Sequence, residues 1–391
     1  MNRIDLRIVL PTILLTAFGM LAIYSTGGIH YLVRQLLFLP VAVAGFLGAY
    51  FIPRRYLLGL AEAAYALGLA LLALVLFFGT GSGSNRWFMI GPVALQPSEY
   101  AKLAAVLMLA KHLSAQRETQ FTFRSLLLPV LICLAPALLV LAEPDLSTAI
   151  LLSLVLAAML YWNGLSARHI LLLYTPLLSF AAGFSLYIWI PLFILLAIVM
   201  LRRTSLFRSL IALATSVFFG LLSPLSLRLL REYQVDRIRS FLAPWLDPHG
   251  VGWNAIQSRI AIGSGRFLGK GFLRGSQNRL GFLPNRHTDF VFSCIGEEFG
   301  FLGSVILLSL FGLLVYRFLL VASSTRDRFD SLLCIGCATV FAGQVFVNIG
   351  MLLGLLPITG IALPFTSYGG SSLLLSYIMV GLVLNVRAKP E

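Results

Sequence analysis

The sequence predicts an all-α polytopic integral membrane protein with about 10–12 transmembrane helices and one large extracytoplasmic loop. Of its 391 residues, 59% are hydrophobic and only 11% are charged, and the mean hydropathy is +0.92. Soluble domains carry about 25% charged residues, so this composition excludes an ordinary soluble domain. The hydrophobic residues also fall into separate runs whose lengths match the thickness of a bilayer.

Apolar runs long enough to cross a bilayer occur along nearly the whole chain, because a crossing needs about 17 to 25 residues. The fourth run is short and charged, and only Gly183-Phe184-Ser185 divides the seventh from the eighth, so ten or eleven spans stay open. We expect residues 1–391 to form a single transmembrane domain. The runs lie near 8–26, 32–52, 56–78, 97–114, 124–142, 146–163, 168–184, 186–201, 206–230, 299–321, 331–356 and 360–386.

Lysine and arginine predict the orientation, because short cytoplasmic loops carry an excess of both. With the N-terminus inside, the inside segments hold most of the cations outside the long loop, and Arg34 and Arg86 are the exceptions in the short outer turns. We therefore expect both termini in the cytoplasm. The opening MNRIDLR has no small-residue cleavage site, which favours an uncleaved first span. Much of the net charge of +14 is this topology signal and does not indicate nucleic-acid binding.

The longest polar passage, about 231–298, falls on the outside and is rich in glycine, arginine and lysine. Long loops translocate largely regardless of charge, so its cations do not overturn the orientation. A cationic outer loop concentrates anionic ligands and stabilises phosphate. Attraction to anionic lipid headgroups is the alternative, and it stays open. The cations are Arg231, Arg237, Arg239, Arg259, Arg266, Lys270, Arg274, Arg279 and Arg286.

Asp289 is the candidate catalytic acid of this loop. It lies in His287-Thr288-Asp289-Phe290, directly before an apolar run, with no acidic neighbour until Glu297. A carboxylate where a loop re-enters the membrane is partly desolvated, which makes it a better base. Asp289 could equally cap the following helix, and the two roles can coexist.

The same loop holds two glycine pairs, one around a serine in Gly263-Ser264-Gly265 and one around a lysine in Gly269-Lys270-Gly271. Glycines let the backbone approach a ligand, and exposed N–H groups together with Lys270 can cradle a phosphate. The alternative is that they are flexible turn glycines. The pattern is neither a P-loop nor a strand followed by GxGxxG, so we expect no nucleotide.

The fourth run opens with Gln96-Pro97-Ser98-Glu99, and Lys102 follows. Glu99 and Lys102 are three residues apart, so they share one face of a helix and can pair. Ionisable groups at membrane depth are costly and usually face a cavity, although a purely structural ion pair would also satisfy itself. Arg86, just upstream, adds a cation on the outer side.

Two further polar spots interrupt the apolar sequence. Glu143-Pro144-Asp145 could hold a divalent cation (Mg²⁺ or Mn²⁺) beside a pyrophosphate, or cap the next helix, and we slightly favour the cap. The stretch 363–372, LPFTSYGGSS, breaks an apolar run. Irregular backbone at membrane depth is tolerated where it is buried or lines a cavity. A helix start with small packing residues is the alternative.

Taken together, these segments resemble the SEDS family (shape, elongation, division and sporulation), and RodA more closely than FtsW. The resemblance spans about residues 85–372 in family order. Ser147 and Trp253 depart from the usual glycine and tyrosine, and two extra spans lie near 168–201. The matching pieces are Asn85-Arg86-Trp87, Gln96-Pro97-Ser98-Glu99 with Lys102, Glu143-Pro144-Asp145-Leu146, Leu246-Asp247-Pro248, Gln257-Ser258, the glycine loop, Phe282 to Phe292, Gly296-Glu297-Glu298 and Ser367 to Ser372.

The resemblance implies a peptidoglycan glycosyltransferase that polymerises lipid II during cell-wall elongation, on the outer face of the cytoplasmic (inner) membrane. It also implies a working complex with a class B penicillin-binding protein (a transpeptidase) and with other elongation-complex membrane proteins. Asp289 would be catalytic, as the general base in an inverting transfer from a lipid-pyrophosphate donor. The residues expected to bind substrate are Arg86, Glu99, Lys102, Gln257, Ser258, Gly263, Gly265, Lys270, His287, Thr288, Ser367, Gly369 and Gly370.

A lipid II flippase, a transporter without chemistry, is the main rival, because many spans and an anionic-lipid-binding loop would suit it too. A flippase needs a polar path to both leaflets. In this sequence the polar clusters lie on the outer side, which favours the enzyme. A scaffold that only recruits a synthase would not need Glu99 and Lys102 in the membrane.

Overall fold

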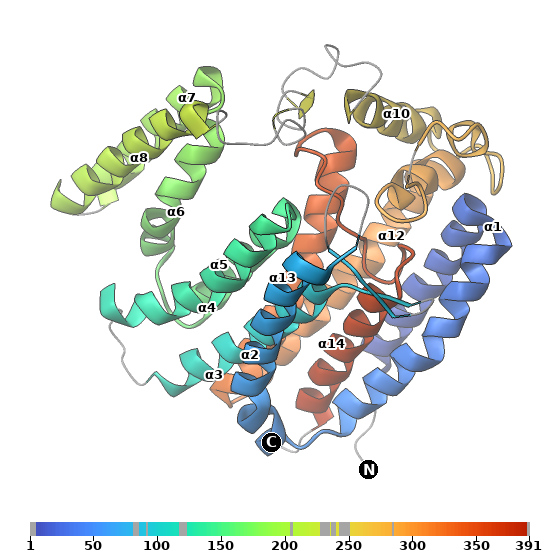
Figure 1. Cartoon of the computed structure of the whole chain (residues 1–391), viewed down its shortest axis with the longest axis horizontal. Coiled ribbons are helices and arrows are strands. Elements are labelled where there is room, and N and C mark those ends of the chain that lie inside the picture. The colour runs from blue at the N-terminus through green and yellow to red at the C-terminus, as the bar shows by residue number, and fades with distance from the viewer. Residues whose placement is uncertain are drawn as a thin grey trace. The chain divides into compact units, whose positions relative to one another are not determined.

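The computed structural model describes residues 5–80, 86–90, 93–116, 123–203, 206–226, 235, 240–241, 251–283 and 285–388, most of which are helical (Figure 1). Most of 231–250, including Leu246-Asp247-Pro248, lies outside the described residues, and so does Asn85. The chain divides into two compact units, Met1–Met159 with Ser240–Glu391 and Leu160–Arg239. The expectation of a single domain stays a prediction.

Among the described residues, seven helices are long and apolar enough to cross a membrane, and three shorter apolar helices accompany them. The described parts of the predicted runs fall on helices, although the last run begins too early, because 360–369 is irregular and its helix starts at Gly370. The elements are α1 (Leu6–Phe51), α2 (Arg54–Phe78), β1 (Phe88–Ile90), β2 (Val93–Leu95), α3 (Pro97–Ala115), α4 (Phe123–Ala142), α5 (Leu146–Trp162), α6 (Ala167–Ala182), α7 (Leu186–Arg203), α8 (Leu206–Ser226), α10 (Val251–Ser264), α11 (Ser276–Arg279), α12 (Val291–Ser324), α13 (Arg328–Leu353) and α14 (Gly370–Ala388).

Helix α1 holds the first two predicted spans in one element of 46 residues, with a break at Gly28, where φ is 75° and ψ is −172°. Asp5, before its first arm, lies 4.0 Å from the Arg387 guanidinium near the end of α14. Near the end of its second arm, the Tyr50 carbonyl accepts a hydrogen bond of 2.5 Å from Asn385 of α14. The two arms therefore run in opposite directions beside α14, the first antiparallel and the second parallel to it. Helix α14 lies beside α1 in Figure 1.

Helix α3 corresponds to the fourth predicted run, which is short and charged, and its surroundings explain both features. It packs against α2, α4, α13 and α14, and most of its residues are buried. A helix enclosed by other helices does not have to be apolar on every face. The hairpin β1–β2, paired with Phe88 opposite Leu95, leads into it.

Helix α12 is broken at Gly300, where φ is 66° and ψ is −160°. A break strands the carbonyl groups before it and the N–H groups after it, which is costly inside a membrane. The glycine loop, residues 265–271, supplies partners on both sides of the break. The N–H groups of Lys270 and Gly271 donate to the carbonyls of Glu297 and Glu298, both at 3.0 Å, and the carbonyls of Arg266 and Phe267 accept from Phe301 and Leu302 at 2.9 and 3.1 Å.

The second compact unit, Leu160–Arg239, contains α6, α7 and α8, which pack on one another. Helix α6 ends at Ala182 with Gly183 as its C-cap, so the short division predicted between the seventh and eighth runs is confirmed. Ser179 and Ser216 share a buried hydrogen bond of 2.7 Å between α6 and α8. Gly183 lies against Gly220, where a side chain would collide with the Gly220 carbonyl. Small residues of this kind let membrane helices approach closely.

Candidate active site

Asp289 lies in the turn 285–290 that leads into α12, and its residue is half-buried. Its N–H donates to the carbonyl of Asn285 at 3.2 Å. The N-cap of α12 is Phe290, the residue after Asp289, and the capping alternative for Asp289 stays open. A methyl group added to Gly360, whose φ is 74°, would lie 3.1 Å from Oδ2 of Asp289. The backbone at Gly360 is therefore one wall beside the carboxylate.

The irregular segment 354–369 packs directly onto this turn. The Ser367 hydroxyl accepts from the Leu363 N–H at 2.8 Å and donates to the Thr288 carbonyl at 2.6 Å. The Tyr368 N–H donates to the His287 carbonyl at 2.9 Å. Irregular backbone was predicted for 363–372 and is confirmed as far as Gly369, and the helix start that was the alternative lies at Gly370.

Gly369 and Gly370 connect the same segment to the second arm of α1. The Gly369 N–H donates to Oε1 of the buried Gln35 at 3.2 Å. Gly370 begins α14 against the ring of Phe38, which a side chain at this position would meet at 2.7 Å. Both glycines therefore have a packing role, and their predicted contact with substrate stays a prediction.

His287 is held in a cluster of aromatic rings. Its ring centroid lies 4.2 Å from that of Tyr31 and 5.7 Å from that of Tyr368. Burial, and then the nearby charge of Arg286, lower the pKa of His287 below its usual 6.5. Arg286 itself donates to the Thr26 carbonyl at 2.8 Å. His287 is therefore mainly neutral at pH 7, two residues before Asp289 in the chain.

The side chain of Arg86 binds backbone carbonyl groups of the acidic turn before α5. Its guanidinium donates to the carbonyl of Glu143 at 2.8 Å and to that of Pro144. Asp145 caps α5, because Oδ1 accepts from the Thr148 N–H at 3.2 Å and Oδ2 from the Thr148 hydroxyl at 2.8 Å. The favoured capping role of Asp145 is confirmed.

Glu143 has a different environment from Asp145. It is 1% exposed, and neither carboxylate oxygen has a hydrogen-bond partner among the described residues. Burial, followed by the charge of Asp145, raises the pKa of Glu143 to about 8, against the opposing effect of Arg86. Glu143 is therefore mostly a neutral acid at pH 7.

This acidic turn is linked to Asp289. Ser147, the second residue of α5, donates a hydrogen bond to the Thr359 carbonyl at 3.3 Å. Thr359 precedes Gly360, whose backbone faces the Asp289 carboxylate. A series of contacts therefore connects Arg86 to Asp289, through the acidic turn, Ser147 and the backbone at 359–360.

Glu99 and Lys102 form the predicted ion pair, with 2.7 Å between Nζ and Oε1. Both are almost fully buried, at 6% and 2% exposed. The hydroxyl of Ser371 accepts from the Gln96 N–H at 3.3 Å and donates to the Ala94 carbonyl at 3.0 Å, which ties the start of α3 to that of α14. Whether the pair also contacts a substrate stays a prediction.

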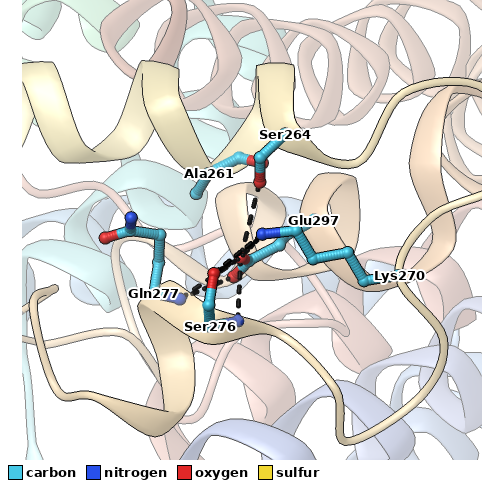
Figure 2. Close-up of polar contacts among 6 residues, drawn as sticks. All are labelled: Ala261, Ser264, Lys270, Ser276, Gln277 and Glu297. Carbon is cyan, nitrogen blue, oxygen red and sulfur yellow. Dashed lines mark hydrogen bonds and ion pairs between the residues drawn. The ribbon is translucent and has the colours of Figure 1, made fainter.

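Lys270 pairs with Glu297, which was not among the residues expected to bind substrate (Figure 2). Glu297 is 0% exposed, and its Oε1 lies 2.7 Å from the Lys270 Nζ. The same oxygen accepts from the N–H and the hydroxyl of Ser276, both at 2.9 Å. A side chain at Gly265 or Gly269 would collide with the carbonyl of Gly296 or Glu298. The glycine loop therefore has a packing role, and its role as a phosphate cradle stays a prediction.

Three more predicted substrate-binding residues lie on α10. Ser258 is buried, shares a hydrogen bond of 2.7 Å with Ser293 and donates to the Leu352 carbonyl at 3.0 Å. Gln257 is also buried, and its Oε1 has no partner among the described residues. Gly263 is exposed. Of these three, only Gly263 is open to a ligand in the structure as it stands.

Among the described residues, no group of three or more histidine, cysteine, aspartate or glutamate side chains could hold a metal ion. Asp145 uses both oxygens for its cap, and Glu143 lies beside the positive Arg86. The divalent cation that the sequence suggested beside Glu143 and Asp145 stays a prediction.

Comparisons with known proteins agree with the geometry. The family model FtsW/RodA/SpoVE, described as "Cell cycle protein", matches residues 4–196 and 181–391. The chain is 34% identical to peptidoglycan glycosyltransferase MrdB of Escherichia coli K12, covering 98% of this chain and 94% of the relative. It is 34% identical to a probable peptidoglycan glycosyltransferase FtsW of Trichlorobacter lovleyi (98% and 93%). It is 32% identical to the stage V sporulation protein E of Bacillus subtilis (98% and 96%).

Solved structures share the fold. A chain from a study of polymerization and crosslinking by a peptidoglycan synthase complex matches with a TM-score of 0.76 at 31% identity, covering 99% of this chain and 98% of that chain. The rod shape determining protein RodA of Thermus thermophilus matches with a TM-score of 0.66 at 28% identity, covering 98% and 96%.

Proposed function

Because the chain belongs to the FtsW/RodA/SpoVE (SEDS) family, it is a multi-pass membrane peptidoglycan glycosyltransferase, and we propose that Asp289 is its general base. The observation that carries this assignment is the placement of Asp289. Its half-buried carboxylate lies against the backbone of Gly360, in a turn that the segment 354–369 binds. Arg86 lies at the far end of the same contacts.

In this proposal, Asp289 accepts the proton of the 4-hydroxyl group of the acceptor sugar. The hydroxyl oxygen attacks the anomeric carbon of a lipid II donor, and the bond from that carbon to the pyrophosphate breaks with its electron pair leaving on the pyrophosphate. A single displacement through an oxocarbenium-like transition state inverts the α-linkage to β. General-base help of this kind contributes about 10²–10⁴-fold.

The departing pyrophosphate needs positive charge, which stabilises the transition state most where it is fixed in advance. Lys270 is paired with Glu297, so exposed arginines of the outer loop, together with Arg86, are better placed for this role. We propose that a divalent cation, where the reaction uses one, arrives on the pyrophosphate of the substrate. The exposed arginines of the described loop are Arg259, Arg266, Arg274 and Arg279.

The topology and the partners are part of the proposal. Both termini would face the cytoplasm and the loop 231–298 the outside of the inner membrane, which the cation distribution supports. A class B penicillin-binding protein would crosslink the new strands, and the structural match within a peptidoglycan synthase complex supports such a partner. Relatives named FtsW, MrdB and stage V sporulation protein E match at similar identity, so the elongation role rests on the RodA-like motifs.

The test is polymerisation of lipid II by the purified full chain, with and without its transpeptidase, followed on gels. Wild type should produce glycan strands and Asp289→Asn almost none, at equal yield of folded protein. Glu62→Gln, which changes an exposed acid paired with Lys111, is the control and should stay active. If wild type made no polymer but moved lipid II across liposomes, the flippase would be the correct assignment.

A further inference from the structure

We propose that Asn348 of α13 is a positioning residue for Asp289, an inference that rests on Asp289 being the general base. Asn348 is 0% exposed. Its Nδ2 donates to the carbonyl oxygen of Asp289 at 3.1 Å and to that of Ile361 at 2.6 Å. One side chain from a different helix therefore holds the main chain of the proposed base.

The bond to Asp289 completes a row of three. The carbonyls of His287, Thr288 and Asp289 are consecutive along the chain. Each accepts one hydrogen bond, either from α13 or from the segment 354–369 that follows it. The donors are the Tyr368 N–H, the Ser367 hydroxyl and the Asn348 amide. With the peptide groups on both sides of Asp289 held, the position of its carboxylate depends mainly on rotation of its own side chain. Asn348 is the only one of the three donors that contacts Asp289 itself.

The second bond of Asn348, to the Ile361 carbonyl, holds the backbone segment that faces the Asp289 carboxylate. Ile361 follows Gly360, whose backbone faces Oδ2 of Asp289. By binding the carbonyls of both Asp289 and Ile361, Asn348 sets the distance between the proposed base and the wall beside it. This task needs two N–H groups on one atom, which asparagine supplies. Aspartate has none, and serine has a single donor.

Asn385 provides a matched control within the same protein. It is also buried, and its Nδ2 also donates to two backbone carbonyls, those of Tyr50 at 2.5 Å and Ile52 at 2.9 Å. It lies near the end of α14, whereas the contacts with the Asp289 turn are at the start of that helix. Fifteen residues separate Gly370 from Asn385, which is about 22 Å along a helix. The two asparagines thus share chemistry and burial but differ in distance from the proposed base.

The experiment compares Asn348→Ala with Asn385→Ala in the full chain, measuring melting temperature and the kcat and KM for lipid II. Both variants should melt at lower temperature by similar amounts, because each loses two buried hydrogen bonds. Only Asn348→Ala should lose kcat, by about 10–100-fold per folded molecule with KM within about twofold, because a misplaced catalytic group is costly. Asn348→Ser, which keeps one donor, should fall between wild type and Asn348→Ala, and it replaces that variant if Asn348→Ala does not fold.

An equal kcat in Asn348→Ala and Asn385→Ala, or a change in KM alone, would overturn the positioning role. Asp289→Asn separates this result from a failure of the base assignment. If Asp289→Asn is inactive and Asn348→Ala is as active as Asn385→Ala, only the positioning role fails. If Asp289→Asn retains turnover, the base assignment fails and the positioning role fails with it. In the Asp289→Asn background, Asn348→Ala should cause no further loss of residual turnover.

Discussion

At the scale of single residues, the position of Asp289 is set by contacts that its neighbours in the turn make with other parts of the chain. Its neighbours His287 and Thr288 have carbonyl groups held by the segment 354–369, and His287 has its ring among Tyr31 and Tyr368. The turn is thus bound from two sides. These contacts hold the backbone of the turn that carries Asp289.

His287 should make the folded protein sensitive to acid. Its folded-state pKa lies below its usual 6.5, so its contribution to stability is present above pH 6.5 and is lost as the pH falls through the lowered value. His287→Phe keeps the ring contacts and removes the titration. We expect the melting temperature of wild type to drop by a few degrees more than that of His287→Phe between pH 7 and pH 5.

The control is His169→Phe, because His169 is exposed in α6 and contacts none of these rings. It should follow the wild-type pH dependence. Identical pH dependence of the melting temperature in wild type and His287→Phe would contradict this account of His287.

Some site residues could be found from sequence and others could not. Asp289 stands out because it is a lone carboxylate with no acidic neighbour until Glu297. Arg86 stands out because it is a cation in a short outer turn, where cations are rare. Asn348 sits inside a helix and no local pattern distinguishes it, and Gly296-Glu297-Glu298 resembles the family without showing what Glu297 binds. Their roles depend on partners 59 and 27 residues away, so only the folded chain shows them.

At the scale of elements, the break in α12 at Gly300 explains the glycine loop. The loop gives hydrogen-bond partners to the peptide groups on both sides of the break, and its glycines allow the close approach. The sequence correctly marks the loop as unusual. It cannot show that the backbone contacts are made with α12, because a phosphate and a broken helix both require small residues and free N–H groups.

The Lys270–Glu297 pair tests the two interpretations of this loop. Lys270→Met leaves Glu297 charged and fully buried, so we expect a loss of about 3 kcal/mol in stability, the low end for breaking a buried pair because Lys270 is 31% exposed. Glu297→Gln should cost less, since Lys270 can reach solvent. The double variant should lose less than the sum of the two.

Lys111→Met is the matched control, because Lys111 and Glu62 form a more exposed pair at 2.9 Å. It should change stability by at most about 1 kcal/mol. Denaturant or thermal unfolding in detergent measures all four variants. A raised KM for lipid II in Lys270→Met, with unchanged stability, would favour the phosphate cradle over the packing role.

At the scale of the whole molecule, hydropathy alone located the apolar spans, because the length needed to cross a bilayer is a strong constraint. The apolar runs 168–184 and 186–201 correspond to α6 and α7 of the second compact unit, two of the shorter apolar helices, and their crossing of the membrane as two extra spans stays a prediction. Hydropathy misplaced the start of the last span, since residues 360–369 are apolar enough to resemble a helix, yet they are irregular. Irregular backbone in such a place is recognised from its tertiary partners.

The orientation can be tested with single cysteines, because Cys133, Cys294, Cys334 and Cys337 are all buried. Ser324→Cys, in the junction between α12 and α13, should be protected from a membrane-impermeant thiol reagent in intact cells. Leu280→Cys, exposed in the loop after α11, should be labelled. Both should react after permeabilisation, and the reverse pattern in intact cells would contradict the predicted topology.

The most direct test of the central claim separates binding from chemistry at Asp289. Wild type and Asp289→Asn, each reconstituted in nanodiscs, would be compared for affinity toward lipid II and for single-turnover formation of the first glycosidic bond. A general base predicts affinity within about threefold and a bond-forming rate lower by about 10²–10⁴-fold. Loss of affinity with an unchanged bond-forming rate would show that Asp289 holds the substrate and that another group accepts the proton.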